Sequence, residues 1–228
     1  VIANGENMTH GKGMTQEHVN DMIEAGVDFF TSGNHIWANK DVMGQLDNPK
    51  FPVIRPANYP PDVPGSGYRI IQDYMMRKVL VINLIGRVFM KDDFDCPFRK
   101  ADEILEAVKN EKLSAIIVDF HAEATSEKVA LGHYLDGRVS AVIGTHTHIP
   151  TADPRVLDEG TAYITDAGMV GPRDSVIGLR KDTIIRQFLT QLPVKHDVAE
   201  SECVFSAVLV DIDAKTKKAN SIEHIFDV

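Results

Sequence analysis

The sequence has few cysteines and no long apolar run. Cys96 and Cys203 are the only two among 228 residues, and neither belongs to a CxxC pair. Two thiols so far apart argue against a disulfide scaffold and against a thiolate zinc site. No apolar run approaches the roughly 18 residues of a membrane span, and no signal peptide is visible. The sequence therefore predicts a cytoplasmic protein that does not enter a membrane.

Positive charge is also scarce. The chain has 24 Lys and Arg against 33 Asp and Glu, a formal net charge of −9. This balance argues against a broad nucleic-acid-binding surface. A small anionic substrate would need a local cation, for which a bound metal is the obvious candidate. No GxSxG motif is present, and neither cysteine has a histidine nearby in sequence, which disfavours a Ser or Cys nucleophile.

Apolar runs alternate with amphipathic segments along the chain. Strands are predicted at 27–31, 68–72, 78–84, 115–120, 139–144, 161–165, 204–212 and 221–226, and helices at 15–25, 41–46, 100–110 and 127–136. The proline-rich stretch 51–67 predicts a connecting loop. This order favours an α/β fold with a largely parallel or mixed sheet, in a single domain spanning residues 1–228.

Residues that can bind metals follow four of the apolar runs. They are Glu6, Asn34, His35, His121, His146 and His148. Sites in open α/β sheets form outside the carboxyl ends of the strands, and oxygen and imidazole donors suit divalent iron, manganese or zinc. Taken alone, each motif has an ordinary alternative: a turn for Gly33-Asn34, a buried core histidine for His121, and solvated side chains elsewhere. Their shared position after strands favours the metal interpretation.

Four sequence blocks carry a resemblance to a known family. Asn4-Gly5-Glu6-Asn7, Gly33-Asn34-His35-Ile36-Trp37, the stretch 119–126 (DFHAEATS) and the stretch 144–148 (GTHTH) occur in this order. Together they resemble the YmdB family of bacterial calcineurin-like metallophosphoesterases. The resemblance implies a four-layer α/β/β/α sandwich that binds two divalent metal ions, iron or manganese. It also implies an enzyme that hydrolyses 2′,3′- or 3′,5′-cyclic nucleotides.

The resemblance also implies roles for the metal-binding residues. Glu6 matches the carboxylate that bridges the two metals. Asn34, His121 and His146 match ligands of the second metal, and His148 matches a ligand of the first. His35 matches the residue that protonates the leaving group, while Asn7 and His10 match substrate-binding positions.

The sequence departs from the family pattern at one place. The family opens with a strand ending in Gly-Asp, whose Asp ligates the first metal, and no such segment precedes Val1. The expected sandwich therefore lacks its usual N-terminal strand and helix, and the first metal has only Glu6 and His148. Pairing with a second copy of the chain is one way to complete the sheet, which leaves a homo-oligomer open.

Two other functions remain open at the sequence level. A regulatory protein that senses a nucleotide or RNA with little turnover is favoured by the missing Asp and opposed by the general acid His35. A phosphomonoesterase could also use this scaffold. The expected partner of the enzyme is a small anionic phosphodiester substrate.

Overall fold

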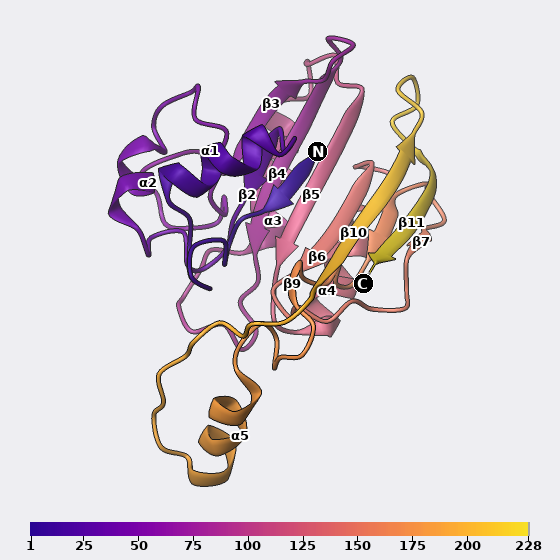
Figure 1. Ribbon diagram of the computed structural model, residues 1–228. Coiled ribbons are helices and arrows are strands. Elements are labelled where there is room, and N and C mark those ends of the chain that lie inside the picture. The colour runs from indigo at the N-terminus through magenta and orange to yellow at the C-terminus, as the bar shows by residue number, and fades with distance from the viewer. Residues whose placement is uncertain (228) are drawn as a thin grey trace.

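The computed structural model describes residues 1–227 and contains helices and strands in alternation (Figure 1). The helices are α1 (Gln16–Glu24), α2 (Lys40–Gln45), α3 (Pro97–Ala107), α4 (Thr125–Leu135) and α5 (Lys181–Thr190). The strands are β1 (Ile2–Asn4), β2 (Phe29–Thr31), β3 (Tyr68–Gln72), β4 (Lys78–Ile85), β5 (Ala115–His121), β6 (Ala141–Thr145), β7 (Arg155–Val156), β8 (Ala162–Ile164), β9 (Gly171–Pro172), β10 (Cys203–Ile212) and β11 (Ala219–Asp227).

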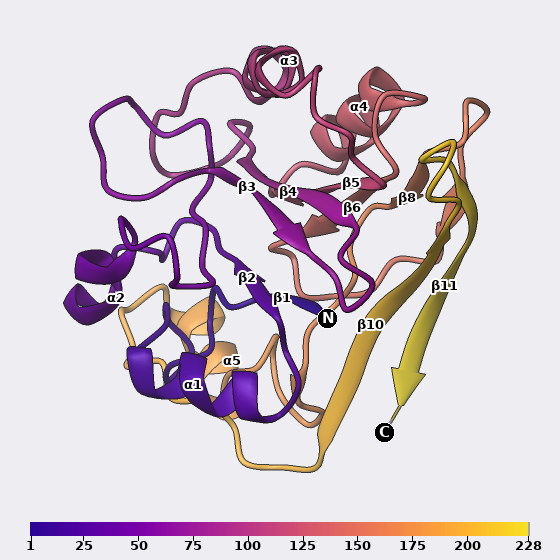
Figure 2. The same ribbon diagram turned by 90° about the horizontal axis from the view of Figure 1, so that it is seen from above.

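A six-stranded mixed sheet forms the centre, in the order β3-β4-β5-β6-β8-β7. Strands β4, β5, β6 and β8 run parallel, while β3 and β7 pair antiparallel at the two edges. Helices α3 and α4 cover one face (Figure 2). The pairs β1-β2 and β10-β11 lie on the other face, and α1 and α2 lie outside β1-β2. The four-layer α/β/β/α prediction is confirmed.

The alternation of side chains in β5 explains which residues face each layer. Ile116, Val118 and Phe120 pack in the cluster formed with the residues of α3 and α4. Ile117 packs in the separate cluster that includes Val210 and Ile222 of β10 and β11. Because side chains alternate between the faces of a strand, the odd-numbered residues Asp119 and His121 share the face of Ile117. The strand thereby presents its polar end to the second β layer.

Most predicted elements are present within a few residues. Helix α1 starts where its capping residue places it, with the Thr15 hydroxyl accepting a hydrogen bond from the His18 amide. The loop at 51–67 contains no named helix or strand. Helix α5 and the two-residue strands β7 and β9 were not predicted. No helix among the described residues is long and apolar enough to cross a membrane.

Candidate active site

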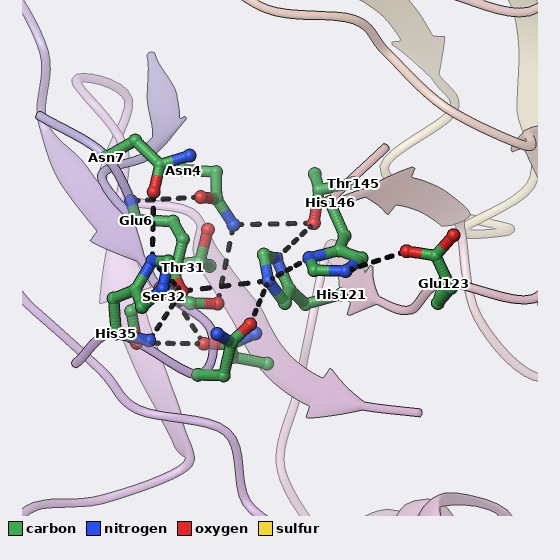
Figure 3. Close-up of polar contacts among 12 residues, drawn as sticks. Asn4, Glu6, Asn7, Thr31, Ser32, His35, His121, Glu123, Thr145 and His146 are labelled. Atoms are coloured by element: carbon green, nitrogen blue, oxygen red, sulfur yellow. Dashed lines mark hydrogen bonds and ion pairs between the residues drawn. The ribbon is translucent and has the colours of Figure 1, made fainter. Parts of the chain in front are cut away.

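The carboxyl ends of strands from both β layers meet at one place. Asn4 ends β1 and leads to Glu6, and Thr31 ends β2 and leads to Asn34 and His35. His121 ends β5, while His146 and His148 follow β6. Figure 3 shows side chains from these segments pointing toward one another. The structure therefore brings together the strand ends that the sequence analysis singled out.

The buried ring of His121 has a defined tautomer. The Thr145 hydroxyl donates to Asp119 Oδ1 at 2.8 Å, so the Thr145 oxygen is free to accept from His121 Nδ1 at 3.1 Å. Asn4 Nδ2 donates to the other Asp119 oxygen at 2.8 Å, and the Thr31 hydroxyl also donates to it. Because the Nδ1 proton is used in this chain of bonds, His121 Nε2 carries a lone pair.

The ring of His146 is oriented in the same way by a carboxylate. His146 Nε2 lies 3.0 Å from Glu123 Oε2, which accepts its proton and leaves a lone pair on Nδ1. That Nδ1 lies 3.0 Å from His121 Nε2. Burial lowers the pKa of both rings, so both are neutral near pH 7. A carboxylate behind a ligating histidine is a usual feature of metal sites.

Further oxygen acceptors converge on the same point. His121 Nε2 lies 3.1 Å from Asn34 Oδ1 and 3.8 Å from Glu6 Oε1. Glu6 is 4% exposed, and its Oε2 is buried with no hydrogen-bond partner. The two ring nitrogens and the Asn34 oxygen carry no proton toward one another, and such atoms repel unless a proton or a cation lies among them. Glu6, Asn34, His121 and His146 together supply nitrogen and oxygen donors that suit a divalent metal ion.

Asn34 adds a neutral oxygen donor from the segment after β2 to this set. Within residues 1–227, no three His, Cys, Asp or Glu side chains are arranged to hold a metal ion, and this includes Glu6, His121 and His146. The donor atoms suit a metal, but the side chains would have to adjust to bind one. We name Glu6, Asn34, His121 and His146 the donor cluster.

Gly33 makes the close approach of two of these segments possible. A Cβ at this position would lie 2.3 Å from His121 Nε2, far inside contact distance. Any side chain here would displace the His121 ring, which Thr145 holds through Nδ1. The glycine before Asn34 is therefore needed for the donor cluster to form.

His35 lies beside the donor cluster and is partly open to solvent. Its side chain is 33% exposed, and Nδ1 lies 3.2 Å from Glu6 Oε1 and 3.1 Å from the side-chain amide of Asn7. Its backbone amide donates to Glu6 Oε1 at 2.5 Å. Burial, followed by the charges of Lys12, His146 and His148, lowers the pKa of His35 to about 4. Burial raises the pKa of Glu6 to about 8, so in the metal-free protein the proton resides on Glu6.

His148 reaches the site through Asn7. The amide group of Asn7 contacts His148 Nε2 at 2.9 Å and lies between the rings of His148 and His35. His148 Nδ1 lies 3.1 Å from the carbonyl oxygen of Ile177, to which it donates. The role of His148 in a first metal site and the substrate-binding role of Asn7 remain predictions.

His10 is placed differently from the other predicted residues. It is exposed, and its ring stacks edge-to-face on His18 with the ring centroids 6.0 Å apart. Its loop nevertheless touches the site, because the Gly13 amide donates to the Glu6 carbonyl oxygen at 2.6 Å. The substrate-binding role of His10 remains a prediction.

Several residues of the site were not assigned from the sequence. They are Asn4, Thr31, Asp119, Glu123 and Thr145. Two of them carried a usable signal. Asp119 lies two residues before His121, so a strand puts both on one face, and Glu123 lies two residues after it.

Comparisons with known proteins agree with the family resemblance of the sequence blocks. The family model for YmdB-like protein matches residues 1–225. The chain is 50% identical over 226 residues to the 2′,3′-cyclic-nucleotide 2′-phosphodiesterase of Bacillus subtilis (strain 168), covering 99% of this chain and 84% of that protein.

Solved structures extend the agreement to the fold. A hypothetical protein from Thermus thermophilus superposes with a TM-score of 0.92 at 43% identity, covering 99% of this chain and 86% of that one. A protein from Mycoplasma pneumoniae described as a novel phosphatase superposes with a TM-score of 0.91 at 36% identity, covering 100% and 81%. The chain belongs to the YmdB-like family.

Proposed function

We propose that this chain is a metal-dependent phosphodiesterase that hydrolyses 2′,3′-cyclic nucleotides. The observation that carries the proposal is the donor cluster, in which His121 and His146 direct lone pairs at each other and at two oxygen donors. A relative with half of its residues identical is a phosphoric diester hydrolase by name. An ester of this kind is an anion, and a cation at the donor cluster would hold it in a chain of net charge −9.

The donor atoms would supply four ligands to one ion and two to a second. Glu6, Asn34, His121 and His146 would hold one divalent ion, and Glu6 Oε2 with His148 would contribute to a second. When bound, such ions polarise the phosphoryl group and lower the pKa of water, which supplies the attacking nucleophile at neutral pH. Nitrogen and oxygen donors without thiolate suit iron, manganese or zinc, and the family resemblance favours iron or manganese.

His35 is the residue we assign to proton transfer. Asn7 and Glu6 hold its Nδ1, which leaves Nε2 as the atom that can face a substrate oxygen. Its pKa of about 4 keeps the ring neutral in the ligand-free protein. An anionic phosphodiester beside the ring favours the protonated form of His35. Substrate binding would therefore promote protonation of His35, which then donates this proton to the leaving ribose oxygen.

The test measures turnover of four substrates by the same protein with added Mn²⁺. We expect hydrolysis of 2′,3′-cyclic AMP and of bis(p-nitrophenyl) phosphate, with much weaker activity on p-nitrophenyl phosphate. Turnover of 3′,5′-cyclic AMP at a comparable rate would widen the substrate class to both cyclic diesters. Binding of 2′,3′-cyclic AMP without turnover of any substrate would contradict the proposal and favour a nucleotide-sensing protein.

A phosphomonoesterase is the second candidate. The likeness to the Mycoplasma pneumoniae structure described as a phosphatase favours it. Preferential hydrolysis of p-nitrophenyl phosphate over the diester in the same assay would establish this alternative instead.

A further inference from the structure

A buried ion pair, Lys128–Asp166, contacts Thr147, the residue between His146 and His148. Lys128 of α4 and Asp166, after β8, are each 1% exposed in their side chains, with Nζ and Oδ2 2.8 Å apart. Removing two charges from water is costly, and apolar residues of similar volume often stabilise a protein as well or better. This pair therefore requires an explanation beyond the stability of the core.

The Asp166 carboxylate accepts hydrogen bonds from Thr147, the residue between His146 and His148. Its Oδ2 accepts from the Thr147 amide at 3.1 Å and from the Thr147 hydroxyl at 2.7 Å, in addition to Lys128. Lys128 Nζ also lies 3.4 Å from the Thr147 hydroxyl. Oδ1 accepts from the Gly168 amide at 2.9 Å, which fixes the carboxylate from the other side. Both members of the pair thus converge on Thr147.

The backbone on either side of Thr147 needs such an anchor. His146 has φ +98° and His148 has φ +66°, left-handed values that cost energy in residues with a side chain. Strained residues of this kind persist only where the surrounding structure holds them. The Asp166 carboxylate holds the one residue they share.

The end of β6 is shaped to bring the pair into position. A Cβ on Gly144 would lie 1.8 Å from the Thr165 carbonyl oxygen and 3.2 Å from Lys128 Cδ. Only glycine permits the segment before Asp166 and the stem of Lys128 to pass this close under the strand. The Ala167 amide donates to the Gly144 carbonyl oxygen at 2.9 Å, which ties the two segments together.

We propose that the Lys128–Asp166 pair is the positioning element of the metal site: through Thr147 it sets the directions in which His146 and His148 present their ring nitrogens. Neither charged group is assigned as a ligand; both act through the two histidines. The inference rests on the proposed function, because the positioning has its purpose in metal binding.

The experiment compares Asp166→Asn and Thr147→Val with the wild type. Mn²⁺ affinity is measured by calorimetric titration, thermal midpoints are recorded without metal, and imidazole ¹⁵N NMR of the metal-free protein reports the tautomers. Arg55→Met is the matched control, since Arg55 is a buried cation that donates to carbonyls of its own loop, at Pro56 and Pro64.

We expect Asp166→Asn to weaken Mn²⁺ binding by roughly 10- to 100-fold, the usual effect of losing a residue that orients ligands. Thr147→Val should weaken it in the same direction, and the His146 and His148 ring signals should broaden or shift in both variants. Arg55→Met should lower the thermal midpoint while leaving Mn²⁺ affinity unchanged. The double variant Lys128→Met/Asp166→Asn should recover thermal stability relative to Asp166→Asn without recovering affinity.

Wild-type affinity and unchanged ring signals in Asp166→Asn would overturn the inference. Should Asp166→Asn not fold, Thr147→Val decides alone, because it nearly keeps the volume of a half-buried side chain and replaces the hydroxyl that donates to Asp166 by a methyl group. Absence of Mn²⁺ binding by the wild type would instead refute the proposed function; the ring signals of the metal-free variants would still show whether the pair sets the two histidines.

Discussion

Replacing Glu6 by glutamine should flatten the pH dependence of folding stability in the metal-free protein. The Glu6 carboxyl is buried, and this burial raises its pKa from an ordinary value of 4.5 to about 8. The folded state therefore keeps this proton at pH values where the unfolded chain has lost it. Glutamine has nearly the shape of the protonated carboxyl but does not titrate.

The sign and size follow from proton linkage. A raised pKa in the folded state gives stability that is present below pH 4.5 and is progressively lost as the pH rises to about 8. Between pH 6.5 and 8.5 this loss amounts to about 2 kcal/mol at roughly 1.4 kcal/mol per pKa unit. This window avoids the opposite contribution of His35, whose lowered pKa makes stability rise with pH up to 6.5.

The assay is urea unfolding of EDTA-treated protein at pH 6.5 and 8.5, for the wild type and for Glu6→Gln. The difference between the two proteins cancels every other titrating group. The wild type should lose about 2 kcal/mol more than the variant, and saturating Mn²⁺ should abolish the difference by stabilising the Glu6 carboxylate. Equal slopes in both metal-free proteins would refute the burial argument for Glu6.

Three further changes test the site. His35→Ala should retain metal but lose roughly 10²- to 10⁴-fold in kcat; elemental analysis showing lost metal would contradict the proton-transfer role. Glu123→Gln should weaken Mn²⁺ binding by roughly 10-fold or more, because it removes the charge that orients His146; unchanged affinity in a calorimetric titration would show that Glu123 is dispensable. Gly33→Ala should displace the His121 ring, whose Nε2 would lie 2.3 Å from the new Cβ; a crystal structure with the ring unmoved would contradict this.

Helix α5 shows where pattern reading of the fold failed. The strands β3 and β10 fall within one residue of the sequence prediction, because their alternating or continuous apolar residues are backed by a sheet. In α5, by contrast, Ile184 is the buried residue of the helix, while Phe188 and Leu189 are 78% and 80% exposed. Ile184, Ile185, Phe188 and Leu189 nevertheless recur at helical spacing, so the sequence carried the signal for this helix and the prediction overlooked it.

The site residues that directly follow a predicted strand could be predicted from the sequence. Glu6, Asn34, His35, His121 and His146 could be picked out because each follows an apolar run, and parallel strands deliver their ends to one edge. Glu123 could have been added from its spacing to His121. Thr145 and Asn4 could not, since nothing local distinguishes them from other polar residues at the end of a strand.

The sequence by itself determined which donor atoms are available and in what order along the chain they come. The tertiary structure decided where the protons lie. The proton on His121 Nδ1 is fixed by Thr145 and Asp119, and Asp119 is in turn bound by Asn4, 115 residues away in the chain. Burial then sets Glu6 to hold a proton and His35 to lack one. Desolvation and long-range hydrogen bonds depend on all the segments that surround a group, and for this reason they could not be predicted from local sequence.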